Sequence, residues 1–307
     1  FNTSAPANAF TTNYTGLQNV AYGANALQLN STGNNNAGFG TYALKSNTSG
    51  LDNVAIGSSS LYSNTTGSSN VAIGSASLYA NTIGSQNTCI GFRAGNAING
   101  IAGNAVAGCN NTAIGFYALS NTTTGDSNIA VGALALQLHQ TGYWNTFIGN
   151  RSGVRITDGS RNTAVGFESQ FYSVNAFYNT AVGDRSLYNA TNNSNTAVGT
   201  EAGFYITTGA NNTCIGLQAG ADAVANLTTQ SNYVVLGNNS TANANIKVSW
   251  TVTSDARDKC NIGPCPHGLA LVSSLKPVRY QYRQSRDDEQ PAADARPRYG
   301  FLAQDIL

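Results

Sequence analysis

The sequence predicts an all-β fold, a parallel β-solenoid or β-roll built from coils of about 17 residues. Three observations predict it. A five-residue word recurs at a nearly constant spacing, β-branched residues dominate one position of the word, and proline is absent from residue 8 to 263. Gly and Asn at every turn of the repeat are incompatible with a helix, and uninterrupted strand ladders exclude interior proline.

The recurring word is Asn-x-small-apolar-Gly, and its Asn is taken as position one of a coil. Successive copies are 17 residues apart, except for one spacing of 24 and one of 16. A degenerate copy runs from Asn232 to Gly237 with one extra residue. The regular copies start at Asn19, Asn36, Asn53, Asn70, Asn87, Asn111, Asn128, Asn145, Asn162, Asn179, Asn195 and Asn212.

Each position of the coil has its own chemistry. Position three is nearly always Ala, Gly or Cys, so it predicts an interior with room for small side chains only. Position four is mostly Ile or Val, which suits a pleated strand. A second apolar patch, such as Ser60-Leu61, precedes a turn such as Asn64-Thr-Thr-Gly67. Gly and Asn tolerate positive φ, so we expect two strands and two turns per coil, stacked about 4.8 Å apart.

A coil this thin has little interior, and solenoids bury apolar surface only through neighbours. We therefore expect a homotrimer in which position four, or the Leu at position nine, packs against the other chains. A lone monomeric solenoid is the alternative.

The repeat, over about residues 15–240, resembles the head repeats of trimeric autotransporter adhesins. It also resembles the Asn-Thr-Ala-Val-Gly repeats of viral and phage fibres, as at Asn179 to Gly183. The resemblance implies a trimeric fibre architecture and does not identify a receptor.

Aromatic residues at outer positions leave two interpretations open. Aromatic rings stack on sugars, so a host-cell glycan or receptor is a candidate partner. Packing between chains, or ordinary surface, is the favoured interpretation. Position ten carries Tyr62, Tyr79, Phe171, Tyr188 and Phe204, and position six carries Phe92, Phe116 and Phe167.

The chain changes character near residue 250. Residues 1–249 hold 14 charged side chains and residues 250–307 hold 15, together with five of the six prolines. Residues 246–252 alternate like a strand, and Pro266 opens a helix-like run. Residues 278–282 alternate again, residues 284–298 form a polar loop, and residues 299–305 are another ordered element. We expect a small α+β segment here.

This segment resembles the intramolecular chaperone domain of endosialidase tailspikes and of many phage and giant-virus fibres. The match rests on Ser254-Asp-x-Arg-x-Lys-x-Asn-Ile262, Leu275-Lys-Pro-Val278 and Gly300-Phe-Leu-Ala-Gln304. The resemblance implies that the domain assembles three chains, drives folding of the shaft and then cleaves itself at Ser254.

The same resemblance assigns the catalytic roles. Ser254 is the nucleophile and Lys259 its base, while Asp255 and Arg257 hold the turn that presents the scissile bond. A serine hydroxyl needs such a base, and burial lowers the pKa of a lysine enough for it to serve.

These observations predict four regions. Residues 1–18 form an N-terminal lead-in, 19–240 the repeat shaft, 241–253 a strand linker, and 254–307 the beginning of the chaperone domain. The chain lacks Met and begins at Phe1, so we expect it to be a fragment at its N-terminus and truncated at its C-terminus.

Composition excludes several function classes. A net charge of +1 with 9% charged residues gives no nucleic-acid footprint, and no apolar run reaches membrane-spanning length. The five cysteines and two histidines lack ligand spacing, so we expect no metal or cofactor. Scattered shaft carboxylates form no repeated pair for glycoside hydrolysis.

The expected function is therefore a tail-fibre protein for host attachment, at a virion surface or outside the cell, whose only enzymatic activity is a single self-cleavage. A cell-surface trimeric adhesin with a non-processing C-terminal cap is the alternative.

Overall fold

The computed structural model describes residues 3–5, 8–11, 15–100, 108–222, 225–244, 277–281 and 298–300. The chain forms two compact units, Phe1–Ser240 and Thr241–Leu307, which are considered separately below.

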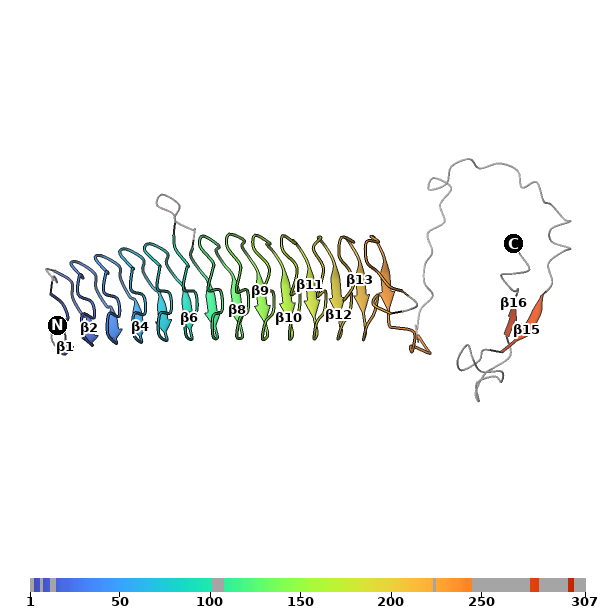
Figure 1. The fold of residues 1–307 in the computed structure, drawn as a ribbon, viewed down its shortest axis with the longest axis horizontal. Helices are drawn as coiled ribbons and strands as arrows, with labels where there is room; N and C mark the ends of the chain where they lie inside the picture. The colour runs from blue at the N-terminus through green and yellow to red at the C-terminus, as the bar shows by residue number, and fades with distance from the viewer. Residues whose placement is uncertain are drawn as a thin grey trace, which may run out of the picture. The chain divides into compact units, whose positions relative to one another are not determined.

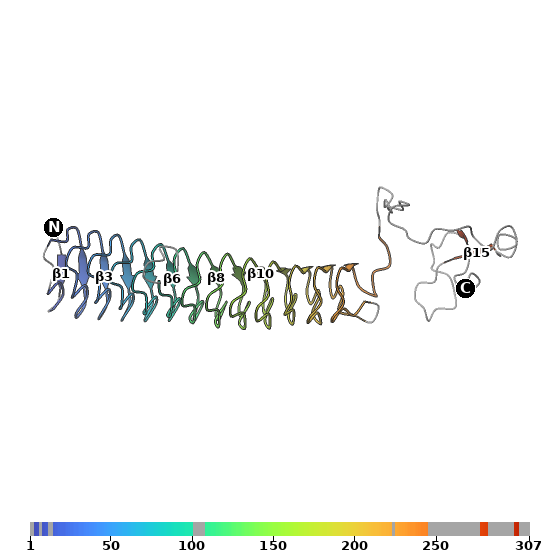
Figure 2. The ribbon, with the colours of Figure 1, turned by 90° about the horizontal axis from the view of Figure 1, so that it is seen from above.

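The first unit is a parallel β-solenoid (Figures 1 and 2). Fourteen three-residue strands form one parallel sheet in chain order, and each strand pairs with the next coil's strand. The prediction of a parallel solenoid with coils of about 17 residues is confirmed. The strands are β1 (Thr3–Ala5), β2 (Val20–Tyr22), β3 (Ala37–Phe39), β4 (Val54–Ile56), β5 (Val71–Ile73), β6 (Thr88–Ile90), β7 (Thr112–Ile114), β8 (Ile129–Val131), β9 (Thr146–Ile148), β10 (Thr163–Val165), β11 (Thr180–Val182), β12 (Thr196–Val198), β13 (Thr213–Ile215) and β14 (Val234–Leu236).

Each coil contains one strand, so the expectation of two strands per coil is wrong. The second apolar patch lies in a turn, because positions seven and nine have left-handed backbone, as at Ser59 (φ +56°) and Leu61 (φ +51°). These residues bend the chain out of the extended conformation. The inter-coil hydrogen bonds nevertheless continue through the turn: the Leu61 N–H donates to the Ser77 carbonyl at 2.9 Å.

The interior is filled from both sides of each coil. Position three points inward from the strand, and Ala55 and Ala72 are fully buried. Position nine points inward from the turn, and Leu61 and Leu78 are also fully buried. The leucine at position nine therefore packs inside its own coil, which contradicts the expectation that it could contact other chains.

The Asn at position one forms a buried side-chain ladder. The Asn53 backbone N–H and Nδ2 both donate to Asn36 Oδ1, at 3.0 and 3.1 Å, and Nδ2 also donates to the Gly67 carbonyl at 2.9 Å. The positive φ lies instead at the preceding residue, such as Asp52 (φ +55°). The repeated Asn is thus required for its amide group and not for a turn conformation.

The glycine at position five is required by both conformation and space. Gly57 has φ +128°, and a Cβ there would lie 2.7 Å from the Gly74 carbonyl carbon of the next coil. Side chains at this position therefore clash with the neighbouring backbone.

The ends of the sheet differ from the repeated word. Strand β1 lies within the expected lead-in and pairs with β2, Thr3 opposite Val20. In the last coil the Tyr233 N–H donates to Asn212 Oδ1 at 3.0 Å, so Tyr233 occupies position one. Asn232 has φ +67°, as position seventeen does elsewhere. The degenerate word therefore starts at Tyr233 and has no extra residue.

In the second unit, β15 (Val278–Tyr280) pairs antiparallel with β16 (Arg298–Gly300), Arg279 opposite Tyr299. This confirms a strand within residues 278–282. The predicted strand at 246–252 and the helix-like run after Pro266 lie outside the described residues. The described part of the chain contains no helix, so an α+β character of this unit stays a prediction.

Candidate functional site

An apolar strip covers the outer face of the solenoid sheet. Since side chains alternate along a strand, positions two and four point outward where position three points in. Tyr22 at position four is 63% exposed, Ile56 is 41% and Ile215 is 44%. The strip, defined by position four of β2 to β14, runs along the whole sheet. Continuous exposed apolar surface of this kind marks an interaction site.

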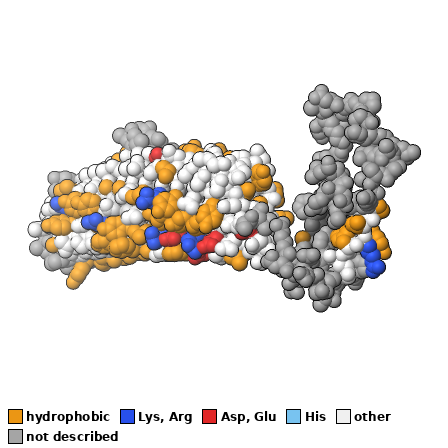
Figure 3. All heavy atoms as spheres, turned by 45° about the vertical axis from the view of Figure 1, so that its right-hand side comes forward, with side chains coloured by type: hydrophobic (Ala, Val, Ile, Leu, Met, Phe, Trp, Pro, Cys, Tyr) orange, Lys and Arg blue, Asp and Glu red, His pale blue; other side chains and the backbone are white. Residues whose placement is uncertain are grey.

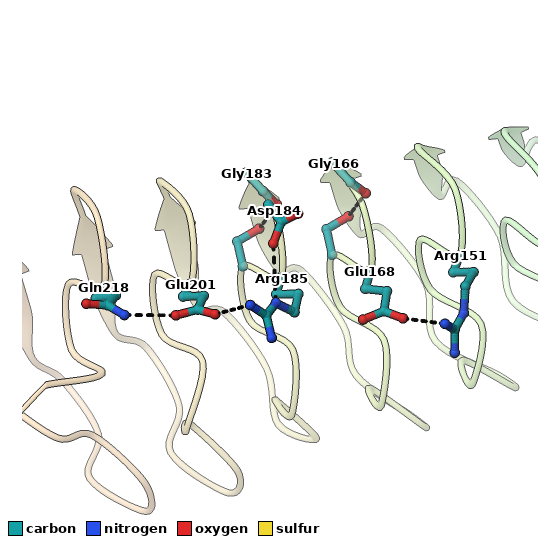
Figure 4. Close-up of polar contacts among 10 residues, drawn as sticks. Arg151, Gly166, Glu168, Gly183, Asp184, Arg185, Glu201 and Gln218 are labelled. Atoms are coloured by element: carbon teal, nitrogen blue, oxygen red, sulfur yellow. Dashed lines mark hydrogen bonds and ion pairs between the residues drawn. The ribbon is translucent and has the colours of Figure 1, made fainter.

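A row of charged side chains follows position seven in later coils (Figure 4). Arg151 Nη1 lies 2.7 Å from Glu168 Oε1, Arg185 pairs with Glu201, and Gln218 Nε2 donates to Glu201 Oε2 at 2.9 Å. Figure 3 shows basic and acidic side chains alternating along this part of the surface. The row neutralises its own charges and presents no single-sign patch to a partner.

The aromatic residues at position ten stack on one another. Phe171 and Tyr188 have ring centroids 5.3 Å apart, and Tyr188 and Phe204 have centroids 4.9 Å apart, with rings within 9° of parallel. Tyr62 and Tyr79 stack in the same way at 5.0 Å. These ring faces cover each other along the shaft, so they are not available to sugars. The geometry supports packing as the role of position ten.

A different aromatic group is exposed at positions sixteen and seventeen, and it was missed by the sequence analysis. We define the Trp144 cluster as Tyr143, Trp144, Arg161 and Tyr178. Trp144 is 54% exposed and Tyr178 is 55% exposed. The signal in the sequence is three successive position-seventeen residues, Trp, Arg and Tyr, where other coils have Asn, Asp, Ser or Gln.

The shaft cysteines lie in the interior. Cys89 and Cys214 occupy position three and are fully buried, and Cys109 is also buried. Burial raises the pKa of Cys89 to about 12 and that of Cys214 to about 11, so both are small apolar core residues and not reactive thiols. Cys260 and Cys265 lie outside the described residues.

The described ranges contain no group of three or more His, Cys, Asp or Glu side chains placed to hold a metal ion. The same ranges contain no helix long and apolar enough to cross a membrane.

The predicted catalytic residues, Ser254, Asp255, Arg257 and Lys259, lie outside the described residues, so their mutual geometry stays a prediction. The described part of their unit is the β15–β16 pair, which joins residues 278–280 to residues 298–300.

Comparison with known proteins identifies the C-terminal segment. Residues 254–307 match the family model described as chaperone of endosialidase, and the match begins at Ser254. No curated protein and no solved structure matches the chain. The chain therefore joins a β-solenoid to a C-terminal segment of the endosialidase-chaperone type, an arrangement like that of tail-fibre proteins.

Proposed function

We propose that the chain is the shaft and chaperone segment of a homotrimeric attachment fibre of a virus or phage. The observation that carries the proposal is the chaperone match, which begins 18 residues after Leu236, the last residue of the solenoid sheet (254 − 236 = 18). A chaperone segment on such a chain assembles three copies, and the fibre stands at the virion surface, outside the cell.

The apolar strip supports the trimer. Position-four side chains are exposed along the whole sheet, whereas position-nine leucines are buried in their own coil. Only the strip therefore has apolar surface left for other copies, and it repeats once per coil, as a fibre axis shared by three chains requires. In this arrangement the sheets of the three chains face one another.

Self-cleavage is the second part of the proposal. The Ser254 hydroxyl attacks the scissile peptide carbonyl while Lys259 accepts its proton. The C–N bond then breaks, the released amine takes that proton, and water hydrolyses the resulting ester. Asp255 and Arg257 position the turn, and the reaction occurs once per chain without an external substrate.

Intact mass of the full-length protein tests the cleavage. Wild type is expected to give a fragment boundary beside Ser254, and Ser254→Ala a single uncut chain. Lys259→Arg is also expected to stay uncut, because arginine keeps the charge but does not release its proton. Ser273→Ala is the matched control and is expected to cleave. Cleavage that persists in Ser254→Ala contradicts the assigned nucleophile.

Oligomeric state tests the fibre separately. Ile114→Asp, which places a charge in the exposed strip, is expected to convert the trimer to monomers in sedimentation, because a buried unpaired charge is costly. Leu134→Asp at position seven is the control and is expected to stay trimeric. An uncut wild-type trimer instead favours an adhesin with a non-processing cap, to which the solenoid repeat is equally suited.

A further inference from the structure

The Trp144 cluster has a geometry that the other aromatic rows lack. The guanidinium carbon of Arg161 lies 4.6 Å from the Trp144 ring centroid and 5.3 Å from the Tyr178 ring centroid. Arg161 Nη1 donates to the Tyr178 hydroxyl at 2.9 Å. Arg161 is therefore held between two aromatic side chains, in the order of the coils from which they come.

The far face of the indole is left open by its row. Tyr143 meets Trp144 edge-on, with centroids 5.0 Å apart and rings at 86°. In the preceding coil, position seventeen is Ser127, a small side chain, and the Tyr178 side of the row is followed by Ser194. The indole thus has one face against Arg161 and no large side chain of its row against the other.

Arg161 also differs from the arginines of the position-seven row. Arg151 and Arg185 each pair with a carboxylate. Within the described residues, Arg161 forms no ion pair, and its side chain is exposed. A guanidinium carries five N–H donors, so the bond to Tyr178 leaves several of them for a ligand carboxylate.

The residue types at this position indicate a selected feature. Trp144 and Tyr178 have φ +57° and +60°, a conformation that bulky side chains rarely adopt and that Asn and Asp tolerate better. The other coils use small or polar residues here. Three consecutive exceptions, all exposed, are not needed for the core of the solenoid.

A contact between copies of the chain is the competing explanation, and the extent of the cluster argues against it. A seam between three identical rods repeats at every coil, as the apolar strip does. The Trp144 cluster is confined to the coils that contribute residues 143, 144, 161 and 178, so it fits a ligand of limited length.

We propose that the Trp144 cluster binds an acidic glycan, a chain of uronate sugars, with a sugar ring on the open face of Trp144 and a sugar carboxylate on Arg161. Aromatic rings receive the apolar face of a pyranose, and guanidinium binds carboxylate through paired hydrogen bonds. The inference deepens the proposed attachment function and rests on it for its biological role.

Binding to a defined sugar panel tests the site. The full-length protein is exposed to immobilised oligomers of galacturonate, glucuronate and mannuronate, each beside its neutral hexose counterpart. At least one uronate oligomer is expected to bind about tenfold more tightly than its neutral counterpart, because the neutral sugar lacks the charge-assisted bonds.

Two variants assign the contacts. Trp144→Ala is expected to abolish binding, and Arg161→Gln is expected to reduce the uronate oligomer to the level of the neutral one. Tyr205→Ala is the matched control, since this exposed ring pairs with Phe204 outside the cluster, and it is expected to bind as wild type. Binding of no uronate oligomer, or unchanged binding by Trp144→Ala, overturns the proposal.

Accessibility and assembly are measured on the same samples. With Trp250→Phe as background, acrylamide is expected to quench Trp144 fluorescence in the assembled protein, and a shielded Trp144 overturns the site in favour of a chain–chain contact. A trimer that binds no uronate overturns the glycan site and leaves the fibre proposal standing. A monomer that binds through Trp144 has the opposite meaning.

Discussion

The N-terminal coils (residues 19–86) and the later coils (residues 87–211) fill the same interior in different ways. Every N-terminal coil has Leu at position nine and Asn at position twelve, as in Leu61 and Asn64. These Asn side chains form a second buried ladder, in which Asn64 Nδ2 donates to Asn47 Oδ1 at 2.7 Å. The inner chemistry of this region repeats from coil to coil.

In several later coils the large apolar side chain moves across the coil. Gly95, Gly153 and Gly203 stand at position nine, and Ile98, Ile156 and Ile206 stand at position twelve, where each isoleucine is fully buried. A Cβ on Gly203 would lie 3.0 Å from Ile206 Cδ1, so the two positions share one space.

The change between the two fillings leaves a mismatch where they meet. The Asn81 Oδ1 atom ends the position-twelve ladder, because the next coil has Ile98 there, and it is buried without a hydrogen-bond partner. Position three takes part as well: the fully buried Phe147 fits beside Gly153, whose added Cβ would lie 2.5 Å from its ring. The comparison teaches that a coil conserves interior volume and not residue identity at each position.

The largest expected effect comes from removing one filling without supplying the other. Leu61→Gly is expected to lower the free energy of unfolding by about 4 kcal/mol, because it leaves a cavity in a close-packed interior. Adding Asn64→Ile is expected to recover about 2 kcal/mol, since it buries a new apolar side chain in that space. Urea unfolding monitored by circular dichroism measures both changes. Asn47→Ile in the neighbouring coil is the mismatched control, and recovery by it contradicts shared space within one coil.

The next effect is a pH dependence confined to the later coils. His139, at position twelve, is fully buried, and burial lowers its pKa from 6.5 to about 4. Its Nδ1 lies 3.3 Å from Thr122 Oγ1, its Nε2 lies 3.4 Å from Asn145 Nδ2, and Asp158 is the nearby carboxylate that opposes the shift.

Because the unfolded chain binds the proton more readily than the folded one, stability is present above pH 6.5 and is lost as the pH falls toward 4. The expected loss is roughly 3 kcal/mol. Melting temperatures across this range should show the fall in wild type and a flatter profile in His139→Asn. His267→Asn serves as the control, and a flattened profile in that variant instead assigns the effect to the wrong histidine.

A smaller gain is expected where a later coil has a polar group in place of either filling. Gln170 replaces Leu at position nine and is fully buried, and both of its amide atoms lack a hydrogen-bond partner. Gln170→Leu is expected to raise the free energy of unfolding by about 2 kcal/mol, because an unpartnered buried amide is unfavourable. Gln137→Leu at the partly exposed position ten should change it by less than about 0.5 kcal/mol. A loss of stability in Gln170→Leu would show that the amide has a partner after all.

The smallest effect is expected outside the coil. Glu168→Gln removes the ion pair with Arg151, whose side chain is 44% exposed, and should cost less than about 1 kcal/mol. The cost should shrink further in 1 M salt, where the Debye length is about 3 Å. Thermal melts at low and high salt measure it, with Glu201→Gln as a second point in the same row. A larger effect would place the outer row beside the interior as a determinant of stability.

The repeated word predicted the coil length, the parallel stacking and the inward side chain of position three, because these depend on spacing and on strand alternation. It did not predict that Leu61 lies inside its own coil. Strand alternation does not apply in a turn where Ser59 and Leu61 have left-handed backbone, so the direction of that side chain depends on the folded coil. The Trp144 cluster was missed for a similar reason, since attention to single positions hides contacts between neighbouring coils.

The sequence by itself determined the period, the need for glycine at position five, and the family resemblance of residues 254–307, because each is written in local residue order. Only the tertiary structure decided that the repeated Asn acts through a buried amide ladder and that Gly153 and Ile156 together replace one leucine. Those roles depend on which atoms meet across a coil or between stacked coils. They are set when about 17 residues close on themselves and the next coil stacks upon them.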